Sequence, residues 1–359
     1  MSRFDRARDV LVAAIRAGVF PGCAVEAGSS SAAEWQDALG TLTYDPDAPA
    51  AGAATIYDLA SLTKPIVTAT VAMRLIESRV LALDDAVADR ERAWRGAGKA
   101  SVTIRDLLEH ASGLPAWAPL WRQARGRAVV EAAAMTPLEY EPRSRSVYSD
   151  LGFVVLGAIL ERAGGASLDR LFEPVSGALS DKAGAELDLT FHPPAAWRSR
   201  TAPTRFAESR DRLLVGEVDD DNAWAMGGVS GHAGAFGTAG AVGAFARALM
   251  RALSGDAPSA AAVAAPETIR AFLAASAVPG SSRALGWDLM RPASSCGSRM
   301  SEAAFGHTGF TGTSLWIDPA RDRYAVLLTN RVHPDAGPVE PIRDVRRAFH
   351  DALADAIEA

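Results

Sequence analysis

Segments with the pattern of β-strands occur near both ends of this 359-residue chain, whereas helical patterns fill its middle. Residues 22–28 and 34–43 are typical of two strands that pair before a turn at residues 45–47. Residues 313–317 and 323–330 are typical of a hairpin near the other end. The sequence therefore predicts one sheet built from both chain ends, with a mainly helical lobe inserted between them.

The predicted fold class is α+β, with an antiparallel sheet flanked by helices in a single domain over residues 1–359. We expect an α/β lobe at about 1–60 plus 280–359, and a helical lobe at about 61–279. Hydrophobic residues make up 48% of the chain, which is enough to bury a large core. Apolar periodicity predicts the main helices at residues 4–15, 62–77, 104–109, 151–163, 239–253 and 341–357.

Composition excludes several classes of function. The net charge is −6 and no basic run occurs, so we expect no nucleic-acid partner. Two distant cysteines match no metal spacing, and no nucleotide motif is present, so we expect no metal and no cofactor. No apolar run approaches the ~18 residues of a membrane span, and no signal-peptide core follows Met1. We expect a cytoplasmic protein, or a periplasmic one if an export signal has been removed.

The segment Ser61-Leu-Thr-Lys64 places a hydroxyl three residues before an amine. The chain has only three lysines against 34 arginines, and lysine, unlike arginine, can lose its proton in a protein. Pro65 is tolerated only in the first turn of a helix, so the helix should begin close to Ser61. Ser61 and Lys64 then share a helical face and could form a nucleophile and its base. The alternative is a helix-capping serine with a solvated lysine.

A second motif, Tyr148-Ser149-Asp150, precedes the apolar helix at 151–163. Tyr148 and Asp150 are two residues apart, so an extended backbone directs both side chains to one side. The alternative is that Ser149 or Asp150 simply caps the following helix.

A third motif, His307-Thr308-Gly309, enters the C-terminal hairpin. Thr308 and Gly309 would allow a substrate backbone to lie along the edge of the sheet. The alternative is a turn at the start of a strand with a solvated histidine.

In this order, the three motifs resemble S-x-x-K, Y-x-N and K-T-G of the penicillin-binding-protein and serine β-lactamase superfamily. The tyrosine favours the class C branch, which includes D-Ala-D-Ala carboxypeptidases, class C β-lactamases and family VIII esterases. The resemblance covers nearly the whole chain, with further similar segments at 57–64, 103–115, 148–157, 227–237 and 307–313.

The resemblance implies a β-lactamase/transpeptidase-like fold and a role for each motif. Ser61 would be the nucleophile, and Lys64 or Tyr148 the general base. The main-chain N–H groups of Ser61 and Phe310 would form the oxyanion hole. The side chains implied in substrate binding are Asp150, His307, Thr308 and Gly309.

Two positions depart from the family pattern. His307 replaces the lysine of K-T-G, and it would be charged only part of the time near neutral pH. Asp150 replaces asparagine, and a carboxylate near Lys64 favours the protonated amine. The first change argues against efficient β-lactamase activity, and the second shifts the role of base towards Tyr148.

The sequence thus predicts a serine hydrolase that cleaves an amide or ester through an acyl-serine intermediate, similar to an esterase or a D-Ala-D-Ala carboxypeptidase. Its partner would be a small-molecule amide, ester or peptide substrate. The alternatives are a class C-type β-lactamase and a non-catalytic sensor or scaffold. Residues that could form the rim of the pocket are Trp117, Trp121 and His232.

Overall fold

The computed structural model describes residues 2–184 and 186–358. Its largest sheet has six antiparallel strands in the order β2-β1-β11-β10-β9-β8. The strands are β1 (Gly22–Gly28), β2 (Ala33–Gly40), β8 (Asp288–Leu289), β9 (Phe305–Thr308), β10 (Ser314–Asp318) and β11 (Arg323–Thr329). The predicted antiparallel sheet from both chain ends is therefore confirmed.

The pairing of β1 with β11 joins the two ends of the chain. In its register Cys23 lies opposite Thr329, and Gly28 lies opposite Tyr324. Every residue of β1 is buried, because the strand has neighbours on both sides and helices over both faces of the sheet.

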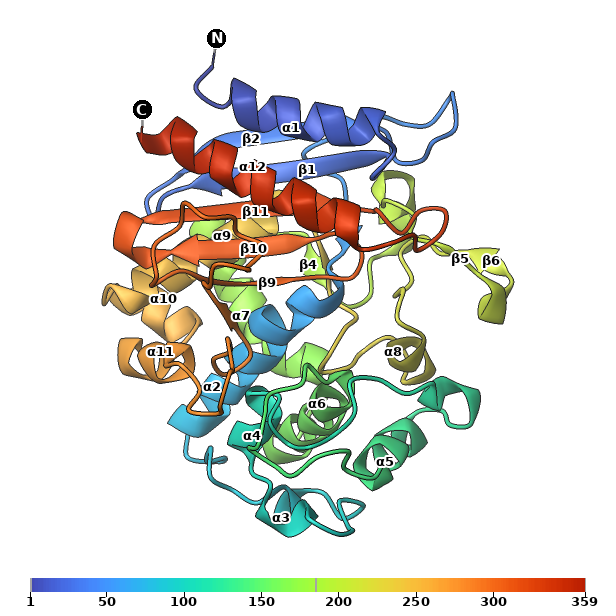
Figure 1. Cartoon of the computed structure of the whole chain (residues 1–359), viewed down its shortest axis with the longest axis vertical. Coiled ribbons are helices and arrows are strands. Elements are labelled where there is room, and N and C mark those ends of the chain that lie inside the picture. The colour runs from blue at the N-terminus through green and yellow to red at the C-terminus, as the bar shows by residue number, and fades with distance from the viewer. Residues whose placement is uncertain (1, 185, 359) are drawn as a thin grey trace.

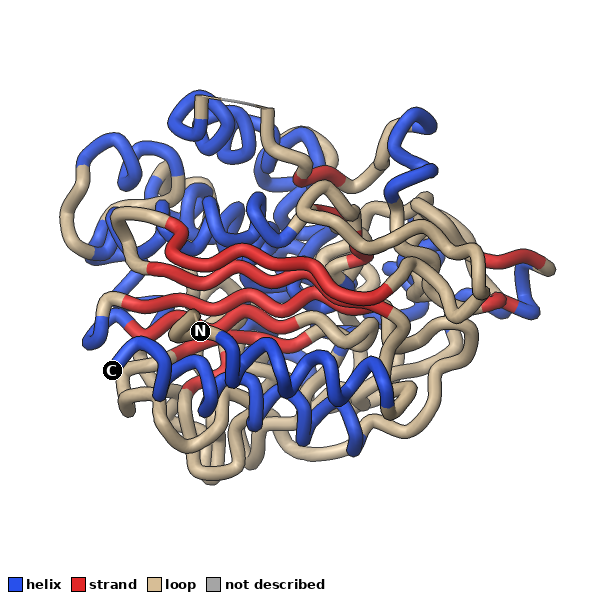
Figure 2. The backbone as a smooth tube through the Cα atoms, turned by 90° about the horizontal axis from the view of Figure 1, so that it is seen from above, coloured by secondary structure: helices blue, strands red, loops and turns tan. Residues whose placement is uncertain are grey.

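Helices form a layer on each face of the sheet (Figures 1 and 2). The terminal helices α1 (Asp5–Arg16) and α12 (Glu340–Glu358) lie side by side on one face. Their apolar side chains pack onto the strands in a separate core cluster that includes Leu11, Leu327 and Phe349. On the other face, α9 (Ala239–Leu253) packs against β1 and β11, although it comes from the middle of the sequence.

The remaining helices all come from the middle of the chain. They are α2 (Thr70–Glu77), α3 (Val87–Arg90), α4 (Ile104–Leu108), α5 (Arg127–Met135), α6 (Asp150–Gly164), α7 (Leu168–Ala183), α8 (Asp221–Ala225), α10 (Ala257–Ala262) and α11 (Pro266–Leu273). Helix α6, whose residues from Leu151 to Leu160 are all buried, packs against α2, α4, α5 and α7. Short strands β3 (Tyr57–Asp58), β7 (Phe236–Gly237) and β4 (Leu189–Thr190) form a second sheet, and β5 (Phe206–Ala207) pairs with β6 (Arg212–Leu213).

Within the described residues, no single helix is long and apolar enough to cross a membrane. Only α6 and α7 taken together reach that length and composition, and they meet at an angle of 77°.

The helix expected at 62–77 is regular only in its second half. It starts as a 3-10 turn (Ala60–Leu62), continues as a π-helical segment (Lys64–Ala69), and becomes α-helical at Thr70. Pro65 has no N–H to donate in the first turn, and π-helical segments are often found at functional sites. The irregular winding coincides with the segment that carries Ser61 and Lys64.

Two glycines bring α6 against the loop that precedes β7. A Cβ on Gly231 would lie 2.2 Å from the main-chain oxygen of Phe153 and 2.9 Å from the Cα of Gly157. The Gly231 carbonyl also accepts a hydrogen bond from Thr68 Oγ1 at 2.7 Å. This close approach fixes the position of the next residue, His232.

We expect Gly231→Ala to lower the free energy of unfolding by about 1–3 kcal/mol, because the added methyl group forces two backbone segments apart. Urea denaturation measures the change. The control is Gly177→Ala in α7, where an added Cβ meets nothing within 4 Å. This control should raise stability by roughly 0.5–1 kcal/mol. A Gly231→Ala protein as stable as the wild type would contradict the prediction.

Candidate active site

Ser61 lies in the 3-10 turn that directly follows β3. The preceding residue, Ala60, has φ +47°, a left-handed conformation that costs a non-glycine residue roughly 1–2 kcal/mol. Asp58 Oδ1 accepts a hydrogen bond from the Ala60 N–H at 2.8 Å. The carboxylate therefore helps to hold the turn, and the turn presents the Ser61 side chain to a cleft.

The ammonium group of Lys64 is fully buried and has three oxygen partners. Its Nζ lies 3.0 Å from Ser61 Oγ, 2.7 Å from Asp150 Oδ1 and 3.0 Å from the main-chain oxygen of His232. Burial favours a lower pKa of Lys64, but the adjacent Asp150 carboxylate outweighs it, so the pKa is raised above its ordinary value. Lys64 is therefore a cation at neutral pH, with all three of its protons donated.

Tyr148 contacts the nucleophile directly, because its hydroxyl donates to Ser61 Oγ at 2.7 Å. The ring packs against His110 with centroids 4.6 Å apart, and Lys64 Nζ lies 4.8 Å from the ring centroid. Burial raises the pKa of Tyr148 to about 12, despite the opposing effect of Lys64. The phenol, like the ammonium group, is therefore protonated at neutral pH.

The motif Tyr148-Ser149-Asp150 both caps the following helix and supplies side chains to the cleft, which are the two interpretations that the sequence allowed. Ser149 caps α6, since its Oγ accepts from the Gly152 N–H at 3.2 Å. Its own N–H donates to His110 Nδ1 at 3.0 Å, so His110 supports the turn from the end of α4. Asp150 is the first residue of α6, and its carboxylate pairs with Lys64.

The third motif forms the opposite wall of the cleft, where His307, Thr308 and Gly309 line it at the end of β9. His307 is buried, and its Nδ1 donates to the Thr308 carbonyl at 2.8 Å. Burial is the largest of the effects that lower the pKa of His307 to about 4, and the nearby charges of Lys64 and Arg283 add to it. His307 is therefore neutral near pH 7, rather than partly charged as the sequence predicts.

The cleft between the helical lobe and the sheet has a volume of about 740 Å³. Ser61, Tyr148 and Asp150 line one side of it. Of the predicted rim residues, Trp117 and His232 line the cleft and Trp121 does not. Trp121 instead donates its main-chain N–H to the Asn222 side chain at 2.9 Å, so it supports the base of α8.

Phe310, from the predicted oxyanion hole, also lines the cleft, with 51% of its surface exposed. Its main-chain N–H donates no hydrogen bond within the described part of the chain. The geometry thus leaves this donor available to a ligand.

The sequence predicted His232 only as a rim residue, and it missed Ser230 and Asp220, the two side chains that hold the His232 ring in place. The His232 ring lies between Ser230 Oγ, 2.8 Å from Nδ1, and Asp220 Oδ1, 2.8 Å from Nε2. Asp220 caps α8 and lines the cleft. His232, together with hydrogen bonds from Ala223 and the charge of Lys64, lowers the pKa of Asp220 to about 2, although burial opposes the shift.

Three arginines at one end of the cleft were also missed: Arg331, Arg343 and Arg346. None of them pairs with a carboxylate within the described residues. Arg346 is buried and donates to the carbonyls of Gly309 and Thr313, both at 2.8 Å. Burial, with the charges of Arg331 and Arg343, lowers the pKa of Arg346 to about 9. Three guanidinium groups that form no ion pair within the described residues therefore lie near one another in the cleft lining.

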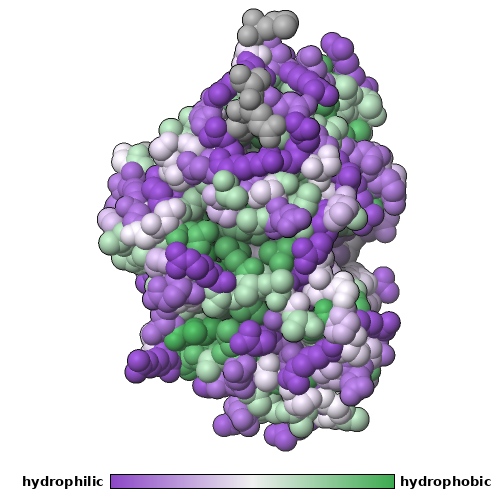
Figure 3. Space-filling view, turned by 60° about the vertical axis from the view of Figure 1, so that its left-hand side comes forward, coloured by the Kyte–Doolittle hydropathy of each residue, from purple (hydrophilic) through white to green (hydrophobic). Residues whose placement is uncertain are grey.

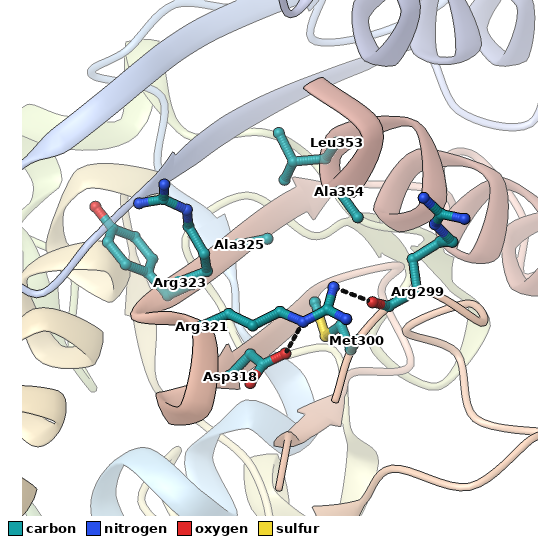
Figure 4. Close-up of a pocket in the computed structure, with 9 residues that line it drawn as sticks. Arg299, Met300, Asp318, Arg321, Arg323, Ala325, Leu353 and Ala354 are labelled. Atoms are coloured by element: carbon teal, nitrogen blue, oxygen red, sulfur yellow. Dashed lines mark hydrogen bonds and ion pairs between the residues drawn. The ribbon is translucent and has the colours of Figure 1, made fainter. Parts of the chain in front are cut away.

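A second cavity of about 450 Å³ lies away from the motifs, between β10, β11 and α12 (Figure 4). Arg321 crosses it and bonds to the main-chain oxygen of Arg299 at 2.6 Å and to Asp318 at 3.8 Å. Its described lining residues include no serine, cysteine or histidine.

On the face shown in Figure 3, apolar surface gathers in the middle of the molecule and is bordered by polar side chains. Among residues 2–184 and 186–358, no group of three metal-binding side chains comes together.

Comparison with known proteins identifies a family. The family model described as Beta-lactamase matches residues 34–348. A protein of Escherichia coli (strain K12), named as a candidate D-alanyl-D-alanine carboxypeptidase, is 31% identical over 319 residues, which cover 79% of this chain and 71% of the relative.

Solved structures with similar folds have lower identity. A penicillin-binding protein homologue from Caulobacter crescentus has a TM-score of 0.74 at 21% identity, over 99% of this chain and 98% of the other. EstCE1, a hydrolase with promiscuous acyltransferase activity, has a TM-score of 0.70 at 20% identity, over 97% and 98% of the two chains. Both likenesses concern the fold, and they confirm the β-lactamase/transpeptidase-like architecture.

We expect the contribution of His307 to stability to fall as the pH falls from about 6.5 towards 4. In the unfolded chain His307 takes up a proton near its ordinary pKa, whereas in the folded protein it does so only near pH 4. At His307 the unfolded state therefore binds more protons in this window. The resulting decrease in the free energy of unfolding is up to about 1.4 kcal/mol per pH unit.

Urea denaturation at pH 7.5 and pH 5.0 measures this loss. His307→Asn should reduce it, and the matched control His192→Asn, at an exposed position, should not. An equal loss in the wild type and in His307→Asn would contradict a neutral buried His307.

Proposed function

Because this chain belongs to the β-lactamase family, we propose that it is a serine hydrolase that cleaves an amide or ester through an acyl-enzyme on Ser61. One observation carries the proposal: Ser61 Oγ lies within hydrogen-bond distance of both Lys64 Nζ and the Tyr148 hydroxyl, in a cleft open to a ligand. A nucleophile in contact with two proton-carrying groups is the arrangement that covalent catalysis requires.

In the proposed mechanism, Tyr148 relays the proton and Lys64 remains a cation. When substrate binds, the Tyr148 hydroxyl turns its proton from Ser61 Oγ towards the leaving atom. Ser61 Oγ then attacks the substrate carbonyl while its own proton passes to the Tyr148 oxygen. The Tyr148 proton passes in turn to the leaving nitrogen or oxygen, so that no free base has to accumulate. The raised pKa of Lys64 supports this assignment, because an ammonium group has no lone pair to accept a proton. Water then releases the acyl group by the reverse route.

The oxyanion of the tetrahedral intermediate would bind the main-chain N–H groups of Ser61 and Phe310. The free N–H of Phe310 supports this role. Each such donor typically contributes ~10²–10³ in rate.

The arginines at the end of the cleft favour a substrate with a negatively charged end group. A neutral His307 cannot supply a positive charge, whereas Arg343 and Arg346 line the same cleft without an acidic partner. A peptide with a free C-terminal carboxylate fits this charge, as in a D-Ala-D-Ala carboxypeptidase. Guanidinium groups bind carboxylates well because their donors match the two oxygens.

A neutral ester is the second candidate substrate. Asp150 pairs with Lys64 beside Ser61, and its carboxylate would repel an anionic group placed close to the reacting carbon. An ester that reaches only Ser61 and the half-exposed Trp117 and Phe310 would avoid the arginines and the repulsion. A class C-type β-lactamase has less support, because its K-T-G lysine is absent. A non-catalytic sensor would not need the contacts of Ser61.

We expect Ser61→Ala to abolish turnover, by roughly 10³-fold or more, because the nucleophile is lost while its neighbours remain. The wild type should also carry a mass adduct on Ser61 after treatment with a fluorophosphonate or a fluorescent penicillin. Ser78→Ala, at an exposed helix end, is the matched control and should leave both readouts unchanged. Turnover retained in Ser61→Ala would refute the mechanism.

The substrate class is then settled by a panel of a D-Ala-D-Ala peptide, its C-terminal amide, a p-nitrophenyl ester and nitrocefin. Faster turnover of the free acid than of the amide supports the carboxypeptidase. Turnover of the p-nitrophenyl ester alone supports the esterase.

Asp150→Asn tests the protonation of Lys64. Removal of the carboxylate lowers the pKa of Lys64, because the amine loses the anion that favours its charged form. If catalysis requires protonated Lys64, the alkaline limb of the kcat/KM profile moves to lower pH in the variant. The control is Asp188→Asn, which breaks an ion pair with Arg200 outside the cleft lining. A variant that becomes more active as Lys64 loses its proton would identify lysine as the base instead.

A further inference from the structure

We propose that Asp58 and the pair Asp220–His232 are positioning residues that keep Lys64 Nζ at hydrogen-bond distance from Ser61 Oγ. The proposal rests on the proposed function of Ser61. The hydrogen bonds of these residues, with the peptide links between chain neighbours, close a ring that starts at the nucleophile, passes through the carboxylates of Asp58 and Asp220, and returns to the nucleophile through Lys64.

The first arm of the ring runs from Ser61 to the loop before α8. Asp58 is buried, and its two carboxylate oxygens have separate partners. Oδ1 accepts from the Ala60 N–H at 2.8 Å, and Oδ2 accepts from the Asp219 N–H at 2.7 Å. One side chain therefore ties the strained residue before Ser61 to the residue before Asp220.

The second arm runs from Asp220 to Lys64. Asp220 Oδ1 lies 2.8 Å from His232 Nε2, and the other ring nitrogen lies 2.8 Å from Ser230 Oγ. With both ring nitrogens bonded, the orientation of His232 is fixed. Its main-chain carbonyl accepts from Lys64 Nζ at 3.0 Å, and Lys64 donates to Ser61 Oγ at 3.0 Å.

The ring matters because Lys64 has no spare donor. Its three protons are shared among Ser61, Asp150 and the His232 carbonyl. If that carbonyl turns away, the buried ammonium moves towards Asp150, and its bond to Ser61 lengthens. Reactions at a positioned nucleophile are sensitive to such shifts, and a displacement of about 1 Å can cost 10²-fold in rate.

The test uses the full chain with substitutions in each arm: Asp58→Asn, Asp220→Asn and His232→Ala. The control is Glu217→Gln in the same loop, where Glu217 pairs with Arg210 and Arg212 and does not line the cleft. Fluorophosphonate labelling of Ser61 gives a rate constant and an affinity, and thermal unfolding reports the fold. We expect the labelling rate constant to fall roughly 10- to 100-fold in each arm variant. The affinity for the probe and the behaviour of the control should not change.

A second readout does not depend on activity. The chain has only three lysines, so ¹⁵N-lysine NMR with Lys99→Arg and Lys182→Arg can assign the Lys64 ammonium signal. We expect slow proton exchange at Lys64 in the wild type, faster exchange in His232→Ala and Asp220→Asn, and a smaller change in Asp58→Asn, which acts on the Ser61 side.

The outcomes separate this inference from the proposed function. A wild type that is not labelled at Ser61 overturns the proposed function, and the NMR readout still decides the role of the second arm. Folded arm variants that label as fast as the wild type and keep slow Lys64 exchange overturn the positioning role. Variants that lose labelling only in proportion to their loss of folded protein overturn it as well, since the residues would then act on stability alone.

Discussion

A buried ammonium group organises the centre of this molecule. Lys64 has no contact with solvent, and a buried charge without partners would cost several kcal/mol. Three oxygens remove that cost, and they come from Ser61, from Asp150 at the start of α6, and from the loop at His232. Segments far apart in the sequence are therefore held within a few ångströms of one another, and the nucleophile is held with them.

The motifs that the sequence predicts are the ones with short-range signals. Ser61 and Lys64 are three residues apart at a helix start that Pro65 restricts, and the two residues do meet. Four strands of the sheet, β1, β2, β10 and β11, were also predictable, because turn residues separate the members of each pair. The short strands β8 and β9 were not predicted. The helix that follows Ser61 was predicted less well, since its π-helical segment follows from tertiary contacts that periodicity does not encode.

The supporting residues had no comparable signal. Asp58 is an acidic residue before a helix, which is an ordinary capping pattern. Its hydrogen bond to the Asp219 N–H joins residues 161 positions apart in the sequence. Asp220 lies in an acidic run that suggests only a loop, and His232, in the glycine-rich segment after it, was predicted as a rim residue and not as a partner of Asp220. Arg346 lies on an otherwise amphipathic terminal helix, and only the packing of α12 on the sheet brings it to the carbonyls of Gly309 and Thr313. Such relations depend on the folded topology and not on local spacing.

The seam between β1 and β11 sets the order in which the protein can be built. During synthesis, β1 and β2 emerge first, but one edge of β1 stays without a partner until nearly the whole chain has been made. An exposed strand edge favours association with other chains. At this stage the nascent protein avoids association only if the edge of β1 is covered or if folding is fast once β11 has been made. The wall of the cleft formed by β9 and α12 arrives in the same final segment. Completion of the central sheet and completion of the cleft are thus one late event, and a chain that stops before β11 has neither.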